Sequence, residues 1–363
     1  MKHLEEYRDP LLVKPLLERI ATAAKRIDRP VTIMEVCGSH TQAIGRYGLR
    51  KLLPPQIRLI SGPGCPVCVT SASDVDRALW LAGQKGLIFA TFGDMMRVPG
   101  TGGSSLQRLR AAGADVRVVA SALDCLALAE REGQSEVLFM GIGFETTAPT
   151  VAAMVRTAQK RGIKNLSVLS AHKIVPPALR LLIGDPEINL DGFLCPGHVS
   201  IMLGSAAYAF LPAAGKAAII AGFEPVDIIA GVLLLLEQLD RGKPEVVIQY
   251  SRVVRPEGNP RAMAIMDEVF ETGDAEWRGL GMIPESGLFF RREFADFDAA
   301  NRFAIPPIEA KDNPGCSCGS VLKGLMDPED CPLFRKFCTP ANPVGPCMVS
   351  SEGSCAAHYR YGR

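Results

Sequence analysis

Short apolar runs alternate with longer amphipathic stretches from about residue 31 to residue 250. The runs are almost continuously hydrophobic, which is typical of strands buried on both faces of a parallel sheet. They predict strands at 31–36, 57–61, 87–91, 116–120, 137–141, 166–170, 192–196, 217–222 and 245–250. The stretches between them, such as 73–83 and 149–162, have the apolar spacing of helices and end at glycine, as a helix C-cap does.

This alternation predicts an α/β fold with helices on both faces of mostly parallel, doubly wound sheets. So many strands exceed one comfortable sheet, so we expect two α/β domains. Residues 251–315 mix charged stretches with proline and glycine, which indicates a connecting region. The predicted division is an N-terminal helical segment at 1–30, domains at 31–135 and 136–250, and a connecting region with a cysteine-rich C-terminal domain at 251–363.

Composition and charge narrow the class of protein. Of 363 residues, 47% are hydrophobic and 22% are charged, which is ordinary for a globular protein. The net charge of +1 gives no reason to expect nucleic acid or an anionic membrane as a partner. The first residues, MKHLEEYRDP, lack the apolar core of a signal peptide. The apolar run at 228–236 is too short to cross a membrane. We therefore expect a soluble, cytoplasmic protein.

The cysteines are concentrated at the C-terminal end of the chain. Cytosolic thiols normally stay reduced, so metal binding or redox chemistry is a better expectation than a disulfide framework. Of eleven cysteines, six lie in the last 48 residues: Cys316, Cys318, Cys331, Cys338, Cys347 and Cys355. Thiolate is the usual protein ligand of iron–sulfur clusters, and the intervening Pro and Gly residues allow the sharp turns that convergence requires. The spacings match neither ferredoxins nor paired-CxxC zinc ribbons, and a structural zinc site is the alternative.

Two motifs follow the first two predicted strands. CGSHT places Cys37 and His40 three residues apart, where a thiolate and an imidazole could bind iron, or the imidazole could lower the thiol pKa. GPGCPVC places Cys65 and Cys68 in a CxxC loop that could cycle between dithiol and disulfide. Two metal ligands or an inert thiol pair are the other interpretations. Ligands of open α/β sheets bind at the carboxyl ends of strands, where both motifs lie.

Further polar residues follow later predicted strands. They are Asp94, Glu145 in GFETT, His172, and Cys195 and His198 in CPGHVS. Any one of them could be a cap or a loop residue, but together they predict a polar cleft between two α/β domains. Cys125 lies within a helical pattern and is expected in the core. GFETT at 143–147 and GFEPV at 222–226 form a faint internal echo after two strands.

The chain resembles the HypD family, whose members act in the maturation of nickel–iron hydrogenases. The resemblance covers essentially the whole chain and rests on CGSHT, GPGCPVC, GFETT, PGHVS and a tail that reads CTP…CMVSSEGSCAA. It implies two α/β domains and a third domain that holds a 4Fe–4S cluster. It also implies a scaffold that, with the small protein HypC, holds an iron while it acquires two cyanides and one carbon monoxide. HypE, working with HypF, supplies the cyanide, and the hydrogenase large subunit receives the finished unit.

The resemblance also implies roles for individual residues. The essential iron-site cysteine falls on Cys37 with His40 nearby, and the redox dithiol falls on Cys65 and Cys68. Glu145 and His198 belong to the same family motifs and are counted with the catalytic residues. The expected cluster ligands are Cys318, Cys331, Cys338 and Cys355, which leaves Cys316 and Cys347 as the spare cysteines.

Together these residues suit an assembly scaffold with a redox role more than an enzyme with ordinary turnover. A thiolate at Cys37 could anchor the iron of an Fe(CN)2CO unit, while the cluster and the dithiol supply electrons. Two other classes of function stay open. One is a stand-alone iron–sulfur thiol oxidoreductase, which needs no protein partner. The other is a binding scaffold whose cluster is purely structural.

Overall fold

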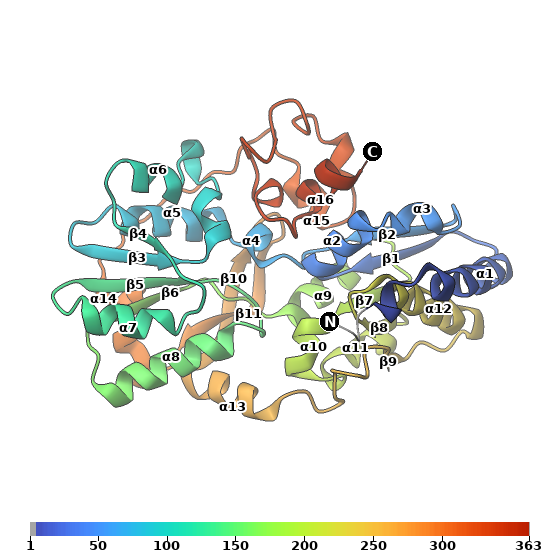
Figure 1. Ribbon diagram of the computed structural model, residues 1–363, viewed down its shortest axis with the longest axis horizontal. Coiled ribbons are helices and arrows are strands. Elements are labelled where there is room, and N and C mark those ends of the chain that lie inside the picture. The colour runs from blue at the N-terminus through green and yellow to red at the C-terminus, as the bar shows by residue number, and fades with distance from the viewer. Residues whose placement is uncertain (1–4, 363) are drawn as a thin grey trace.

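Two parallel sheets organise the protein, for which a computed structural model describes residues 5–362 (Figure 1). The first sheet has the order β2–β1–β7–β8–β9 and the second has the order β4–β3–β5–β6. All the predicted apolar runs form strands in these sheets, which confirms the α/β fold. The strands are β1 (Val31–Glu35), β2 (Ile57–Ser61), β3 (Leu87–Thr91), β4 (Val116–Val118), β5 (Glu136–Gly141), β6 (Leu166–Ser170), β7 (Gly192–Pro196), β8 (Ala217–Ala221) and β9 (Val246–Ile248).

The sheets divide the chain differently from the predicted domains at 31–135 and 136–250. The chain leaves the first sheet after β2, builds the whole second sheet from β3 to β6, and returns to pair β7 with β1. A boundary near residue 135 therefore falls between β4 and β5, which belong to the same sheet. The second domain is an insertion in the first. The apolar pattern identifies each strand but does not tell which strands pair, so the insertion could not be found from periodicity.

Helices pack on both sheets. The amphipathic helix α1 (Pro10–Ile27) begins at Asp9, whose carboxylate accepts the Leu11 N–H, and it turns Ile20 and Ala24 into the core against α12 (Pro225–Arg241). It accounts for the described part of the predicted helical segment, since residues 1–4 lie outside the described range.

No helix within residues 5–362 is long and apolar enough to cross a membrane. The other helices before the hairpin are α2 (Gly38–Arg46), α3 (Leu49–Leu52), α4 (Pro66–Val69), α5 (Ala72–Ala82), α6 (Leu106–Ala111), α7 (Asp124–Arg131), α8 (Ala148–Arg161), α9 (Val175–Gly184), α10 (Gly197–Leu203), α11 (Phe210–Ala213) and α13 (Pro260–Val269).

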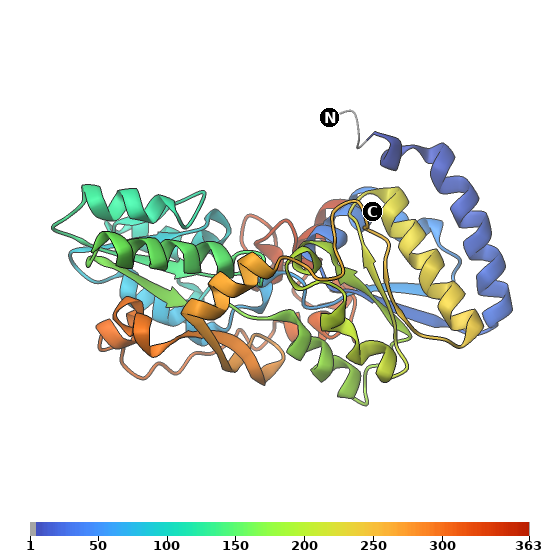
Figure 2. The same ribbon diagram turned by 90° about the horizontal axis from the view of Figure 1, so that it is seen from below.

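The predicted connecting region at 251–315 contains a β-hairpin that the sequence reading missed. Strand β10 (Phe270–Trp277) pairs antiparallel with β11 (Gly281–Phe290), and the hairpin lies along the second domain in Figure 2. These strands are rich in Gly, Asp and Glu and carry Pro284, which hides a strand pattern. Burial of Phe270, Trp277 and Leu288 against neighbouring elements stabilises them instead.

The cysteine-rich tail docks on the first sheet. After α14 (Ala299–Arg302), the chain passes through α15 (Cys318–Leu322) and ends with α16 (Ser354–Tyr361), which packs on α2. In Figure 1 the tail, drawn in red, lies beside α2 and above α4, between the two sheets. Its buried side chains share one apolar core with Met34, Cys68 and Phe193. The predicted cysteine-rich C-terminal region is therefore a packed part of the protein.

Candidate functional site

Cys37 lies at the carboxyl end of β1, as the sequence predicts. It is the residue before the first turn of α2, and its own N–H donates to Glu35 Oε2 at 3.1 Å. Burial raises the pKa of the Cys37 thiol to about 12, with a contribution from the negative charge of Glu352, and the Ser39 and His40 backbone N–H groups oppose this rise. The thiol is therefore protonated at neutral pH.

His40 is fully buried beside the end of β8. Its Nε2 lies 2.9 Å from the Gly222 carbonyl oxygen and 3.2 Å from that of Ala221, so Nε2 carries the hydrogen and donates to both. Burial lowers the pKa of His40 to about 4, which keeps the ring neutral. In the described structure, Nδ1 has no hydrogen-bond partner. An unpaired imidazole lone pair is thus held near the start of α2.

A second histidine, His198, lies at this edge of the sheet in contact with Phe223. The His198 ring, which follows β7, stacks on Phe223 with centroids 4.1 Å apart, and the His40 ring lies 5.0 Å from Phe223. Burial lowers the pKa of His198, and the charge of Glu352 opposes that change. The structure therefore gathers Cys37, His40 and His198 at the carboxyl ends of β1, β7 and β8.

Two carboxylates complete this site, and sequence reasoning missed both. Glu352 from the tail accepts a hydrogen bond from Ser39 Oγ at 2.7 Å, and its charge acts on Cys37 and His198. Glu35 is fully buried beneath the loop and accepts from the Thr41 hydroxyl; burial raises its pKa to about 7. The SEGSC segment of the tail was the available signal for Glu352. Glu35 sits inside an apolar run, which favours a core interpretation.

The CxxC loop lies directly against the Cys37 loop. The Gly38 N–H donates to the Gly64 carbonyl oxygen at 3.0 Å, and a Cβ at Gly64 would lie 2.1 Å from the Cys37 nitrogen, so only glycine fits there. Cys65 precedes the short helix α4, and its sulfur accepts the Cys68 N–H at 3.3 Å. Both thiols are buried, and burial raises the pKa of Cys68 well above its usual value.

The tail cysteines converge on one small cavity. The empty space between its lining atoms, including what is open to solvent, is about 310 Å³. The part of this space that the centre of a water molecule could occupy is about 10 Å³. The Cys316 and Cys318 sulfurs lie 3.3 Å apart, both against Gly345. Cys316, set aside in the sequence reading, is thus part of the lining. The five lining cysteines are Cys316, Cys318, Cys331, Cys338 and Cys355.

Cys347 is the sixth tail cysteine and does not line the cavity. It is fully buried, and its thiol is within hydrogen-bonding contact of Cys318, Cys355 and Cys68. Cys318 lowers the pKa of Cys347, whereas Cys355, Cys68 and burial raise it, and the net value is well above normal. Cys347 therefore joins the cavity thiols to the CxxC loop. All eleven cysteines are free thiols.

Glu145 lies on the other sheet. It follows β5, its Oε1 accepts the Val175 N–H at 2.9 Å, and burial raises its pKa to about 7. His172 follows β6, where Ser170 Oγ lies 3.1 Å from its Nδ1. Burial raises the pKa of the Tyr208 phenol, and the charges of Cys195, Glu145 and Cys37 add to the rise. The structure thus separates the predicted polar residues into two groups, one on each sheet.

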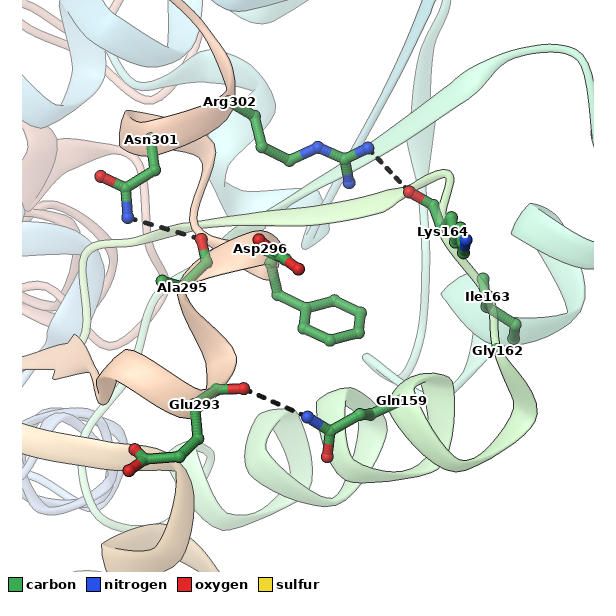
Figure 3. A pocket seen from close by; sticks show the side chains of 10 residues that line it. Gln159, Gly162, Ile163, Lys164, Glu293, Ala295, Asp296, Asn301 and Arg302 are labelled. Atoms are coloured by element: carbon green, nitrogen blue, oxygen red, sulfur yellow. Dashed lines mark hydrogen bonds between the residues drawn. The ribbon is translucent and has the colours of Figure 1, made fainter.

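A pocket of about 500 Å³ lies away from these groups, between the end of α8 and the segment after β11 (Figure 3). The polar groups that Figure 3 draws with dashed lines are already paired with backbone. Gln159 donates to the Glu293 carbonyl oxygen, and Arg302 donates to that of Lys164. The described residues around it include neither cysteine nor histidine. This pocket offers none of the thiol chemistry that the sequence predicts.

The thiols are not arranged around a single ion. Within residues 5–362, no group of three or more His, Cys, Asp or Glu side chains has the geometry to hold one metal ion. Five sulfurs around one cavity instead suit a larger, thiolate-bound group, because four thiolates are the usual ligands of a cubane cluster. The donor set is all sulfur, which favours iron–sulfur chemistry over harder metals.

Comparison with known proteins extends over the whole chain. The HypD family model, described as "Hydrogenase formation hypA family", matches residues 11–362. The hydrogenase maturation factor HypD of Cupriavidus necator is 47% identical over 371 residues, which cover 100% of this chain and 98% of that protein. HupD of Azotobacter chroococcum, a hydrogenase expression/formation protein, is 46% identical over 100% of this chain and 97% of its own. HypD of Escherichia coli K12 is 43% identical over 99% of this chain and 98% of its own.

Proposed function

Since the chain belongs to the HypD family of hydrogenase maturation factors, we propose that it is the scaffold on which the Fe(CN)2CO unit of a nickel–iron hydrogenase is assembled. In this proposal HypC shares the iron, HypE with HypF provides the cyanide, and the hydrogenase large subunit receives the product through HypC. One observation carries the proposal: contacting buried thiols lead from the cysteine-lined cavity to the loop against which Cys37 packs.

Cys37 anchors the iron under construction. A thiolate is the soft ligand that suits a low-spin iron with cyanide and carbon monoxide ligands. The backbone N–H groups of Ser39 and His40 point toward the sulfur and stabilise its anion once iron displaces the proton. The neutral ring of His40, fixed by two backbone carbonyls, orients this loop and keeps a lone pair at Nδ1.

The cysteine-lined cavity fits a 4Fe–4S cluster, which would supply single electrons when bound. Such a cluster takes four of the five lining thiols. Cys318 contacts Cys347, which in turn contacts Cys68. We therefore assign Cys318 to the thiol relay and Cys316, with Cys331, Cys338 and Cys355, to the cluster. This assignment replaces the Cys318 ligand that the family pattern implies.

The relay then consists of two thiol pairs, Cys318 with Cys347 and Cys65 with Cys68. Oxidation of one pair to a disulfide releases two electrons and two protons. Release of cyanide from a thiocyanate-like donor, R–S–CN + 2e⁻ → R–S⁻ + CN⁻, consumes two electrons. The Cys65–Cys68 pair lies next to the Cys37 loop, which is where those electrons are required.

Two serine variants test the proposal as a matched pair. Protein purified anaerobically should be brown, with about four irons and four sulfides per chain. Cys316→Ser should lose the cluster, whereas Cys318→Ser should keep it and lose hydrogenase maturation. The reverse cluster result would return Cys318 to the cluster. A colourless protein with one zinc would overturn the iron–sulfur proposal.

The same pair separates the other classes of function. If Cys318→Ser keeps both the cluster and maturation, the cluster is structural and the relay is wrong. Capture of HypC, with iron carried in the complex and infrared bands of iron-bound cyanide and carbon monoxide, distinguishes the scaffold from a stand-alone oxidoreductase. A protein that turns over a small thiol substrate without HypC and carries no such iron would favour the oxidoreductase.

A further inference from the structure

The tip of the β10–β11 hairpin is wedged between the CxxC loop and the cysteine tail. The Arg278 N–H donates to the Val69 carbonyl oxygen at 2.9 Å, and Thr70 and Trp277 form an antiparallel bridge. On the other side, a Cβ at Gly279 would lie 2.5 Å from the Gly319 Cα, so the tip fits against the residue after Cys318 without a side chain. The hairpin tip therefore touches both ends of the thiol relay.

The side chain of Arg278 is buried at this tip, with 5% of it exposed. Its Nε donates to Asp312 Oδ1 at 2.7 Å, and Nη2 faces the same carboxylate and the Pro99 carbonyl oxygen. Among the described residues, Nη1 has no hydrogen-bond partner. Burial of a guanidinium N–H without an acceptor costs folding free energy, so we expect this group to have a functional role.

Arg278 lies beside the Cys316 end of the cavity, where it lines a pocket together with Asn313 and Val344. The Cys316 N–H donates to the Asn313 carbonyl oxygen at 2.9 Å, and the Val344 N–H donates to the Cys338 sulfur at 3.3 Å. The counter-ion Asp312 is 49% exposed, so water screens its charge more than it screens the buried guanidinium. A net positive potential should therefore remain at the cavity.

We propose that Arg278 is a positioning residue that stabilises the electron-rich state of the cysteine-lined centre, through its buried charge and its spare Nη1–H. This inference rests on the proposed 4Fe–4S cluster. When a low-potential donor adds one electron, the negative charge of the thiolate-bound centre grows, and a fixed cation nearby favours that state. No proton moves in this step.

The test compares four variants of the full chain by electron paramagnetic resonance during a redox titration with dithionite. Arg278→Met should lower the ratio of reduced to oxidised cluster about tenfold at a fixed potential, which is about 59 mV for one electron. Arg278→Lys should recover part of this loss. Asp312→Asn removes the counter-ion and should shift the ratio in the opposite direction. Arg108 is an exposed arginine that lines the same pocket as Arg278, so Arg108→Met is the matched control and should have no effect.

Iron and sulfide contents keep this inference separable from the proposed function. If the wild-type chain holds no cluster, the proposed function fails first. If every variant holds the cluster at the wild-type potential, the role of Arg278 is overturned. Should Arg278→Met fail to load the cluster, Arg278→Lys and Asp312→Asn decide, because a purely structural role would not shift the potential in opposite directions.

Discussion

The same three residues, Gly-Phe-Glu, follow a strand in each parallel sheet. Gly143–Glu145 comes after β5 and Gly222–Glu224 comes after β8, and a helix with proline in its first turn follows each of them. The two segments nevertheless do different things. Phe144 stacks on Trp277 with centroids 5.9 Å apart, whereas Phe223 contacts the rings of His40 and His198.

The glutamates differ in the same way. Glu145 is buried with Oε2 unpaired in the described structure, and burial raises its pKa to about 7. Glu224 forms a capping box at α12 and a bidentate pair with Arg8. The hairpin covers the end of β5, whereas the histidines and the tail surround the end of β8. The chemistry at a strand end is therefore set by the segments that pack over it and not by the local motif.

The largest expected effect tests whether the first sheet carries the iron chemistry. Cys37→Ala should abolish hydrogenase maturation and remove the infrared bands of iron-bound cyanide and carbon monoxide from the complex with HypC. The absorbance of the proposed cluster should stay unchanged, since the cysteines assigned to it lie in the tail. Bands at wild-type strength in this variant would place the iron elsewhere, with Cys195 and His198 as the next candidates.

Separate substitutions of Phe144 and Phe223 test whether one segment serves mainly stability and the other mainly maturation. Phe144→Ala opens a cavity against Trp277 and should lower the free energy of unfolding by about 3–5 kcal/mol, measured by urea denaturation. Phe223→Ala should cost less stability, because Phe223 is only half-buried, but should reduce maturation about tenfold by freeing the His40 and His198 rings. Equal losses of stability and maturation in both variants would erase the distinction between the two segments.

Glu145 should make stability depend on pH. Its pKa is raised from 4.5 unfolded to about 7 folded, so the folded state holds the proton more tightly. The contribution of Glu145 to the free energy of unfolding is complete below pH 4.5 and is lost as the pH rises to 7. The change is on the order of 3 kcal/mol. Denaturation of Glu145→Gln at several pH values should show a smaller fall across this range than the wild type. Glu35 contributes a similar slope to both proteins.

The smallest effect is expected at the Arg8–Glu224 pair. Its arginine is exposed, so solvent screens the attraction. Arg8→Ala should leave both the unfolding midpoint and maturation within experimental error. A clear loss of maturation would instead show that the functional site at the end of β8 extends beyond His40 and His198 to this ion pair.

Much of the architecture could be predicted from the sequence, because buried parallel strands leave uninterrupted apolar runs such as 87–91 and 217–222. The insertion of one sheet in the other could not, since pairing depends on contacts distant in the chain. The hairpin was missed because its stability comes from Trp277 and its neighbours, not from its own pattern.

The motifs at Cys37, Cys65 and the tail stood out because cysteine is rare in ordinary loops. Placement at strand ends predicted one polar cleft between the domains. The structure brings Cys37, His40 and His198 together but leaves Glu145 and His172 on the other sheet. Glu352 and Arg278 could not be found in this way, because their importance depends on which distant segment they meet. The order of the six tail cysteines likewise gave no sign that Cys347 points toward Cys68.

The insertion also sets an order of events during synthesis on the ribosome. The second sheet is complete once β6 has emerged, whereas β1 and β2 must wait for β7, more than a hundred residues later. Domains fold as units as they emerge, so the inserted domain should form first and hold the two early strands in a nascent chain. The cysteine-lined cavity requires residue 355, so it closes last. Loading of the proposed cluster should therefore be a late, largely post-translational event.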